Sequence, residues 1–367
     1  MKVAYMMGSL NRGGTETLML DVFRNKEKAP FQLIGIHRKG GAYRDDFYES
    51  GVKMIECAPK RFGCIRYLIQ LRKLIKSQGV TIIHAQQPLE VIYAYLATIG
   101  MNIPLIQTFH GFYPMRGRTG LLTRLSILLS RELCFVSRYE LDWYRQYCQI
   151  EYSKCHVVYN GVDLSKIDLS EPTCVLKDNK KIKLTMVGNF VKVRDHVTLS
   201  KALQLLSERG MNDFDFYFIG KHSDIEPQIY DECVYICNEN KMTNVHFLGG
   251  RGDVPELLKE MDGFVYSTDH DTFGIAVVEA MAIGLPIVVN DWSVMKEICG
   301  KNENNAVSYF QSKNIEDCAN AIENLLNELI EPTEKFKSRC ASNKKWVRER
   351  YSIEAHIGCL SNVYNLV

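Results

Sequence analysis

The first residues that could do chemistry are the glycines of the segment GSLNRGGT, residues 8–15. They stand between a predicted strand over 3–7 and a predicted helix over 15–25, where the backbone can approach a ligand and the helix N-terminus favours an anion. The segment fails the dinucleotide fingerprint GxGxxG, because Leu10 occupies the place of the second glycine. It fails the phosphate-loop pattern GxxxxGK(S/T), because Gly14 replaces the lysine. The pattern therefore predicts a phosphate-facing loop or an ordinary tight turn, and neither an NAD site nor an ATPase.

A histidine follows a later apolar run. His110 stands just past the predicted strand over 105–109 and is followed by Gly111. In open parallel α/β sheets, ligands bind outside the carboxyl ends of the strands. A histidine at that place can hydrogen-bond a substrate hydroxyl, and a purely structural histidine is the alternative.

Two cations precede a predicted helix in the second half of the chain. Lys192 and Arg194 lie between a predicted strand over 183–187 and a predicted helix over 197–206. Cations beside a helix N-terminus oppose the helix dipole. The arrangement is therefore favourable when they face an anion such as a diphosphate, and a solvated surface loop is the alternative.

The most informative segment, residues 267–289, joins two apolar runs through a polar loop and a short helix. The helix begins near Gly274, where free backbone N–H groups can bind a phosphate. Asp271 in the loop and Glu279 in the helix can reach one pocket and accept hydrogen bonds from sugar hydroxyls. Asp269-His-Asp271 matches a DxD metal pattern by letter only, and the helix N-terminus accounts better for charge stabilisation. No metal site is expected.

Strands alternating with helices position these residues and indicate parallel α/β units. In the first half the predicted strands are 3–7, 31–37, 81–84, 105–109, 133–136 and 155–159, with helices that include 65–77 and 119–130. After a polar linker over 171–181 the pattern restarts, with strands over 183–187, 215–219, 245–248, 263–267 and 286–289. We expect two Rossmann-like domains, 1–165 and 166–345, and a C-terminal helix within 346–367 that crosses back to the first domain.

The composition is that of a globular protein. The chain has 367 residues, of which 46% are hydrophobic and 24% charged, close to ordinary usage. No apolar run reaches the length of a membrane-spanning helix, and residues 1–14 do not resemble a secretory signal. The 12 cysteines are scattered singly, which indicates reduced thiols in a cytoplasmic protein and no zinc site. No nucleic-acid partner is expected.

Charge is distributed unevenly along the chain. Residues 1–165 hold 22 Lys and Arg against 13 Asp and Glu, whereas the remainder holds 23 against 30. Two predicted helices of the first half combine basic and apolar residues, which is typical of helices at a membrane interface. They carry Lys60, Arg61, Arg66, Arg72, Lys73 and Lys76 in or beside the first helix, and Arg116, Arg118, Arg124 and Arg131 around the second. The alternatives are docking on an anionic cytoplasmic membrane face and two core helices with solvated basic faces.

With these motifs in hand, the chain resembles the GT-B glycosyltransferases of family 4, the retaining, nucleotide-sugar-dependent group. The resemblance covers essentially the whole chain. It is carried by Gly13-Gly14-Thr15-Glu16, His110-Gly111, Asn160-Gly-Val-Asp163, Val187-Gly188 and, most specifically, the FG…EAMA-GLP block from Phe273 to Pro286. It implies an α/β fold of the GT-B type, with two Rossmann-like domains facing across an interdomain cleft.

By this resemblance the second domain binds the donor. Glu279 would accept hydrogen bonds from the ribose, and backbone N–H groups near Gly274 and Ile275 would meet the sugar or the diphosphate. Arg194 stands at the position of the family's phosphate-binding lysine.

The first domain would bind the acceptor and complete the donor site. Gly13 and Gly14 would approach the donor diphosphate, and His110 would contact the transferred sugar. The chain departs from the family at Asp271, where the first glutamate of the paired-glutamate motif is usual, and at Asn189, where arginine is usual. Asp271 is expected at the sugar and Asn189 near the diphosphate.

We therefore expect a retaining hexosyl- or N-acetylhexosaminyl-transferase in cell-surface polysaccharide or glycolipid synthesis. The donor would be a UDP- or GDP-sugar, and the acceptor a saccharide or lipid-linked saccharide, without cofactor or metal. The alternatives are a nucleotide-sugar epimerase or hydrolase of the same fold and a non-catalytic GT-B scaffold that supports a partner transferase. A Rossmann oxidoreductase is disfavoured by the failed GxGxxG pattern.

Overall fold

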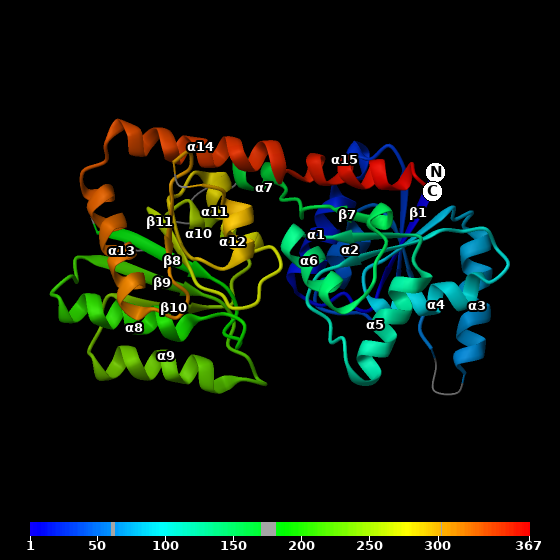
Figure 1. Ribbon diagram of the computed structural model, residues 1–367, viewed down its shortest axis with the longest axis horizontal. Helices are drawn as coiled ribbons and strands as arrows, with labels where there is room; N and C mark the ends of the chain where they lie inside the picture. Colours follow the sequence, from blue (N-terminus) through cyan, green and yellow to red (C-terminus); the bar gives the residue numbers. More distant parts are fainter. Residues whose placement is uncertain (60–62, 170–180, 302) are drawn as a thin grey trace. The chain divides into compact units, whose positions relative to one another are not determined.

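The computed structural model describes residues 1–59, 63–169, 181–301 and 303–367 (Figure 1). It divides into two compact units: unit 1 comprises Met1–Val162 and Tyr351–Val367, and unit 2 comprises Asp163–Arg350. The expected return at residue 346 falls inside a helix that continues unbroken to Arg350 (α14, Glu334–Arg350), so the chain passes back to unit 1 five residues later, at Tyr351. The predicted linker over 171–181, apart from its last residue, and the cations Lys60 and Arg61 lie outside the described residues.

Unit 1 contains a parallel sheet in the order β3-β2-β1-β4-β5-β6-β7. Its strands are β1 (Lys2–Met7), β2 (Gln32–His37), β3 (Lys53–Glu56), β4 (Ile82–Ala85), β5 (Leu105–Phe109), β6 (Glu132–Phe135) and β7 (Cys155–Val157). The chain proceeds outward from β1 in one direction and from β4 in the other. The carboxyl ends of β1 and β4 therefore flank a switch point, where open α/β sheets bind ligands.

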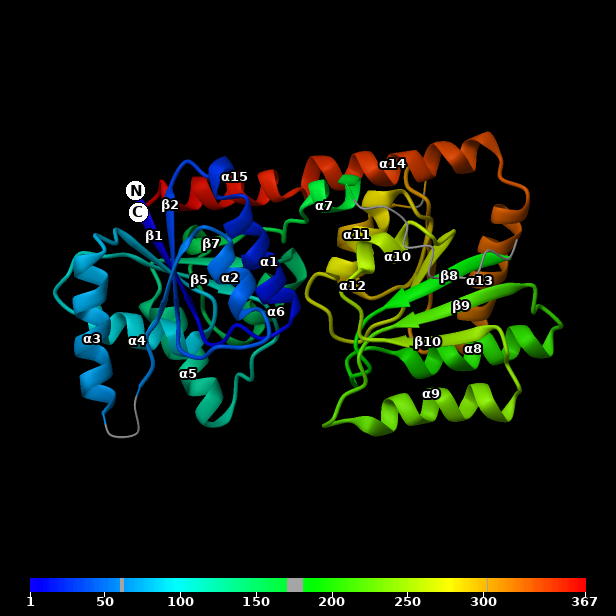
Figure 2. The same cartoon turned by 180° about the vertical axis from the view of Figure 1, so that it is seen from behind.

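Helices cover both faces of this sheet (Figures 1 and 2). They are α1 (Gly14–Arg24), α2 (Arg44–Glu49), α3 (Cys64–Ser77), α4 (Pro88–Thr98), α5 (Gly117–Leu129), α6 (Arg138–Tyr147) and α15 (Ile353–Tyr364). Successive side chains of a strand point to opposite faces. Val3 and Tyr5 accordingly pack in a core with α1, α2 and α15, whereas Ala4 and Met6 pack in a second core with α3 and α4.

Unit 2 contains a second parallel sheet, in the order β10-β9-β8-β11-β12-β13. Its strands are β8 (Ile182–Val187), β9 (Phe214–Ile219), β10 (Val245–Gly249), β11 (Gly263–Tyr266), β12 (Ile287–Asn290) and β13 (Val307–Phe310). Its helices are α7 (Leu164–Leu169), α8 (His196–Glu208), α9 (Pro227–Glu239), α10 (Val254–Leu258), α11 (Ile275–Ile283), α12 (Ser293–Cys299), α13 (Ile315–Ile330) and α14. Helix α8 packs between α9 and α13, and α11 packs on β11, β12, α12 and α14. The switch point lies between β8 and β11.

Helix α5 exposes the residues that a core helix would bury. Leu121 and Leu128 are 68% and 76% exposed, whereas the buried face consists of Gly120, Thr123, Ser126 and Ile127. The interpretation of α5 as an ordinary core helix with a solvated basic face is therefore wrong. Small residues let α5 approach its neighbours closely, and its leucines point to solvent.

Candidate functional site

The glycine loop of unit 1 lies at the carboxyl end of β1, beside the switch point. A Cβ atom on Gly8 would lie 2.6 Å from Oε1 of Gln87, so a side chain there would displace the end of Gln87. Gly13 precedes α1, whose first turn carries no side-chain cap, and Gly13 and Gly14 are exposed. Exposed backbone N–H groups at this helix N-terminus are available to an anion.

A buried ion pair packs against this loop, and no sequence pattern predicted it. Nη2 of Arg38 lies 2.7 Å from Oε1 of Glu90, which is fully buried in α4. Burial raises the pKa of Glu90, and Arg38 opposes that shift. Both side chains come within 3.3 Å of the Cβ position at Gly8, so the ion pair packs directly against the glycine loop.

His110 extends from the carboxyl end of β5 toward the neighbouring strand β4. Its Nε2 lies 2.8 Å from Oε1 of Gln86, which follows β4. Burial, with a smaller contribution from His356, lowers the pKa of His110 to about 3, so the ring is neutral. With Oε1 of Gln86 as acceptor, the proton is on Nε2 and Nδ1 is the accepting nitrogen. The amide nitrogen of Gln86 is buried and has no hydrogen-bond partner within the described residues.

A second neutral histidine holds the strands that carry His110 and Gln86. Nδ1 of His84 lies 2.6 Å from the hydroxyl of Tyr364 in α15, and its Nε2 lies 2.6 Å from Oγ1 of Thr108 in β5. Burial lowers the pKa of His84 to about 3. The Tyr364 hydroxyl also donates to Tyr5 in β1. One buried network thus joins β1, β4, β5 and α15 directly beneath His110.

In unit 2, Arg194 lies at the switch point between β8 and β11. Its Nη2 is 3.1 Å from Oδ1 of Asp271, and its guanidinium lies over the ring of Tyr266. The Tyr266 hydroxyl donates to Oδ2 of the same aspartate. Burial would lower the pKa of Arg194, but Tyr266 and Asp271 raise it above its usual value. The anion that Arg194 faces in the structure is therefore Asp271, and both oxygens of that carboxylate are engaged.

The other aspartate of the DxD letters is also engaged. Nζ of Lys313 lies 2.5 Å from Oδ2 of Asp269 and 3.1 Å from Oδ1 of Asp195. Asp195 in turn accepts from the backbone N–H of Thr198 and so caps α8. Lys313 follows β13 and is remote from both partners in sequence, so no local pattern indicates it. Within the described residues no group of three or more potential ligands could hold a metal ion.

Helix α11 presents one accessible stripe. It begins after Gly274, which has a left-handed φ of 88° and provides no side-chain cap. Val277, Val278 and Ala280 to Ala282 are buried, whereas Ile275, Ala276, Glu279 and Ile283 are partly exposed. Because residues four apart share a helix face, Glu279 lies on the same face of α11 as Ile275, one turn from the helix N-terminus.

In each unit the predicted residues lie at one edge of the sheet. The side chain of Asn189, however, makes a different contact from the predicted one. Asn189 follows β8 as expected, but its Oδ1 accepts a hydrogen bond of 3.1 Å from the backbone N–H of Lys221. Its side chain thus ties the loop after β8 to the loop after β9.

The predicted membrane-facing cations lie on an apolar surface of unit 1. Arg116, Arg118 and Arg124 are exposed on or beside α5. We define the α3–α5 face by the exposed apolar residues Ile65, Ile69, Tyr95, Leu96, Ile99, Leu121, Leu122, Leu125 and Leu128. The only acidic residue in these three helices is Glu90, which is buried and ion-paired. None of the described helices has the length and hydropathy needed to cross a membrane.

These features define a GT-B architecture: two parallel Rossmann-like units, each with a ligand-binding edge at its switch point. Two models of known protein families match the chain and agree with this architecture. The model of Glycosyltransferase Family 4 matches residues 12–166, and that of Glycosyl transferases group 1 matches residues 172–345. The chain belongs to the GT-B glycosyltransferases of family 4.

Individual relatives are similar over long stretches. The chain is 24% identical to EpsF of Bacillus subtilis strain 168, named as a candidate glycosyltransferase, over 100% of this chain and 96% of that protein. It is 26% identical to an Escherichia coli UDP-Gal:alpha-D-GlcNAc-diphosphoundecaprenol alpha-1,3-galactosyltransferase, over 62% of each. The crystal structure of HepE from Anabaena, solved with UDP and glucose, superposes with a TM-score of 0.84 at 16% identity over 100% of both chains.

Proposed function

We propose that this glycosyltransferase moves a hexosyl or N-acetylhexosaminyl group from a UDP- or GDP-sugar to a saccharide or lipid-linked saccharide, with retention of configuration. The observation that carries the proposal is the arrangement in unit 2. A guanidinium and an open helix N-terminus suit a diphosphate, and the adjacent Glu279 carboxylate suits the hydroxyls of a ribose. The names of the E. coli relative and of the HepE complex support a UDP-sugar donor and a lipid-linked acceptor.

The hard step is departure of the diphosphate, on which negative charge grows. The bond from the anomeric carbon to the diphosphate oxygen breaks, and the acceptor oxygen bonds to that carbon on the same face. The acceptor proton passes to the departing phosphate. Arg194 and the N–H groups of Gly274 and Ile275 would stabilise this charge, with Arg194 turning from Asp271 to the phosphate.

Asp271 is bonded to Arg194 in the structure, so a sugar hydroxyl would have to compete for its carboxylate. Its two oxygens hold the guanidinium and the Tyr266 hydroxyl, so it meets a sugar hydroxyl only by exchanging one of these bonds. In unit 1, neutral His110 accepts a hydrogen bond from a hydroxyl of the transferred sugar through Nδ1. Gly13 and Gly14 offer backbone N–H groups to the diphosphate.

The test begins with a thermal-shift panel of UDP, GDP and ADP, followed by product analysis with the matching nucleotide sugars. One nucleoside diphosphate should raise the melting temperature, and its sugar should appear in a product with the anomeric configuration of the donor. Inverted products would contradict retention. Release of the nucleotide at full rate without any acceptor would favour the epimerase or hydrolase.

We also propose that unit 1 docks on the anionic cytoplasmic face of a membrane through the α3–α5 face. Patches this apolar are uncommon on monomeric proteins and mark interaction surfaces. The surrounding arginines and lysines, with no exposed acid in these helices, match an anionic lipid surface, where each cation contributes about 1 kcal/mol. Peripheral attachment would bring the enzyme to a lipid-linked acceptor.

Co-sedimentation with liposomes tests this docking. Binding should be clear with anionic lipid at low salt, weak with neutral lipid, and lost near roughly 0.5 M salt, where screening shortens to a few ångströms. The triple variant Arg116→Glu, Arg118→Glu, Arg124→Glu should lose binding and keep nucleotide affinity. A matched triple variant of the exposed α14 lysines, Lys335→Glu, Lys344→Glu and Lys345→Glu, should bind as the wild type does. Equal binding to both lipids would refute the electrostatic part.

A further inference from the structure

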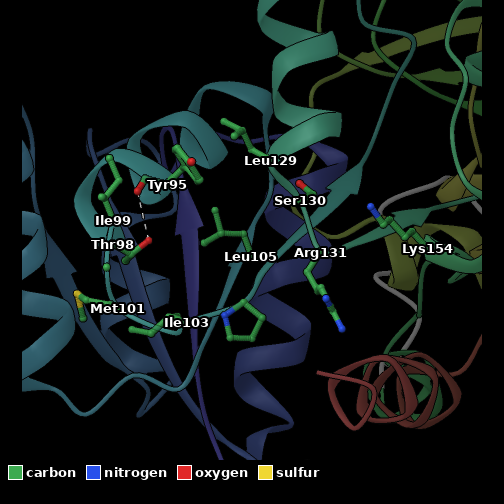
Figure 3. A pocket seen from close by; sticks show the side chains of 12 residues that line it. Tyr95, Thr98, Ile99, Met101, Ile103, Leu105, Leu129, Ser130, Arg131 and Lys154 are labelled. Atoms are coloured by element: carbon green, nitrogen blue, oxygen red, sulfur yellow. Dashed lines mark hydrogen bonds between the residues drawn. The ribbon is translucent and has the colours of Figure 1, made fainter.

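A pocket of about 400 Å³ lies at the amino end of β5 in unit 1 (Figure 3). Its size is within the range of small-molecule sites. The walls include Ile99, Met101, Ile103, Leu105 and Leu129, from the ends of α4 and α5 and the segment that leads into β5.

Two hydroxyls in these walls are bonded to backbone carbonyls. The hydroxyl of Thr98 donates to the carbonyl of Ala94 at 2.7 Å, and that of Ser130 donates to the carbonyl of Ser126 at 2.8 Å. Both hydroxyls are thus satisfied within their own helical turns. The pocket therefore offers an occupant mostly hydrocarbon contact, which favours an aliphatic chain.

One side of the pocket is basic. Arg131 and Lys154 lie together there, apart from Ile99 and Met101 (Figure 3). Arg131 forms no ion pair within the described residues, and Lys154 has a surface partner, Glu151, at 3.6 Å. No acidic residue lines the pocket.

Helix α4 ends at this pocket, and its terminal carbonyls would repel an anion. Arg72 removes much of that repulsion, because its Nη1 donates to the carbonyls of Ala97 and Ile99 at 2.9 and 2.8 Å. An anion at Arg131 and Lys154 therefore meets a largely neutralised helix end.

The pocket is not the place where transfer occurs. Leu105 begins β5 at the pocket, whereas His110 follows the carboxyl end of the same strand. At about 3.3 Å per residue, a strand of this length separates the two ends by roughly 16 Å. A molecule bound at the amino end is therefore not the reacting acceptor group.

The pocket adjoins the α3–α5 face, because Tyr95 and Ile99 belong to both. We propose that it binds one aliphatic chain of an anionic bilayer phospholipid, whose phosphate lies between Arg131 and Lys154. This inference rests on the proposed membrane docking and gives it a specific component. The bound lipid would fix unit 1 on the membrane while His110 remains available to the acceptor.

Calorimetric titration of the full chain with octyl, decyl and dodecyl phosphate, below their micelle concentrations, tests the proposal. Affinity should rise about fourfold with each added methylene, because each buries further apolar area. Decanol and inorganic phosphate should each bind far more weakly than decyl phosphate, since each lacks one half of the ligand. Affinity without dependence on chain length would overturn the proposal.

Variants locate the binding. Arg131→Glu should weaken dodecyl phosphate at least tenfold, and Met101→Trp should abolish its binding by filling the pocket. Lys73→Glu, with the same charge change on exposed α3, should bind as the wild type does. Because Met101→Trp could fail to fold, Ile99→Asp at the exposed rim is a second probe and should also lose at least tenfold. Wild-type affinity in folded Met101→Trp or in Ile99→Asp would refute the site.

The triple variant of Arg116, Arg118 and Arg124 separates this proposal from membrane docking. None of these residues lines the pocket, so the variant should keep its affinity for dodecyl phosphate even where it has lost liposome binding. Loss of dodecyl phosphate binding in this variant would show that the amphiphile binds the general basic surface, and would overturn the pocket as its site.

Discussion

The two units share one type of scaffold, but the buried groups at their candidate sites differ in charge. In both, candidate residues lie near the carboxyl ends of strands in a parallel sheet. In unit 1 the two buried histidines there, His84 and His110, are neutral, because burial lowers their pKa values to about 3. In unit 2 the candidate residues are charged, as Arg194 and Lys313 face Asp271 and Asp269. The sheet determines where a site lies, and the residue types determine which ligand it suits.

In the proposed function, the charged site of unit 2 and the neutral site of unit 1 would bind the two kinds of group in a nucleotide sugar. Unit 2 suits the anionic diphosphate, because a buried cation with a compensating carboxylate can exchange one anion for another. Unit 1 suits hydroxyls, because a neutral imidazole accepts a hydrogen bond without attracting counter-ions. The predictions below test this division of labour.

The largest expected effect is on the neutral side. His110→Ala should reduce sugar transfer by about two orders of magnitude, the low end of what a positioned catalytic group contributes. Nucleotide affinity, measured by calorimetry, should not change, because His110 serves the sugar. His222→Ala, at an exposed histidine of unit 2, is the control. If nucleotide binding collapses as well, His110 has a structural role.

On the charged side, Glu279→Ala should weaken donor binding at least tenfold, because a charged acceptor contributes roughly 1.5–3 kcal/mol. The loss should be equal for the nucleoside diphosphate and its monophosphate, since the ribose is common to both. Arg194→Gln should instead weaken the diphosphate more than the monophosphate. A uniform loss in both variants would remove the distinction between ribose and phosphate contacts.

Acid should destabilise unit 1 before unit 2. Burial lowers the pKa of His84 and His110 to about 3 and that of His356 to about 4, whereas unit 2 has one such histidine, His196, at about 4. Below about pH 6.5 the unfolded chain binds protons that the folded chain excludes. Stability is therefore full above that pH and falls toward pH 3–4, by up to about 1.4 kcal/mol per pH unit for each group.

Tryptophan fluorescence can follow the units separately, because Trp143 lies in unit 1 and Trp292 and Trp346 lie in unit 2. One variant would keep only Trp143, and a second would keep only Trp292 and Trp346. As the pH is lowered, the fluorescence of the first variant should change at a higher pH than that of the second. His356→Gln should move that transition to lower pH. Coincident transitions would mean that the histidines do not distinguish the units.

The smallest expected effect is that of a chelator. Transfer activity should persist in excess EDTA, because Arg194 and the N-terminus of α11 supply the charge stabilisation that a metal would supply. Asp269 and Asp271 are engaged with Lys313 and Arg194. Loss of activity in EDTA, with recovery on adding Mn²⁺ or Mg²⁺, would make these aspartates metal ligands.

Sequence patterns predicted the strands best where an apolar run stood between a glycine or polar loop and a helix. The strand at 105–109 has the predicted bounds, and those at 2–7 and 182–187 differ by one residue. Strand β3 was missed because it is a short edge strand with a charged residue at each end, Lys53 and Glu56. The predicted strands of the second half end at 289, so the edge strand β13 was also missed.

The sequence indicated that His110 and Arg194 follow strands and that Glu279 lies in a helix, and the structure has them there, whereas their roles stay predictions. The site was not predictable where a partner comes from a distant element. Gln86 reaches His110 from the neighbouring strand, and Lys313 reaches Asp269 from beyond β13. The exposure of the α5 leucines could not be predicted either. Apolar residues at helical spacing give the same pattern whether they face a protein core or another apolar surface.

The placement of α15 has a consequence for the order in which the protein forms. Unit 1 needs the last helix of the chain, since Tyr364 bonds His84 and Tyr5 in its core. Unit 2 lies wholly between the two parts of unit 1 in sequence. Every residue of unit 2 is therefore joined to the chain before the final helix of unit 1 is made. Premature termination within the last 17 residues leaves a complete unit 2 sequence joined to a unit 1 that lacks part of its core.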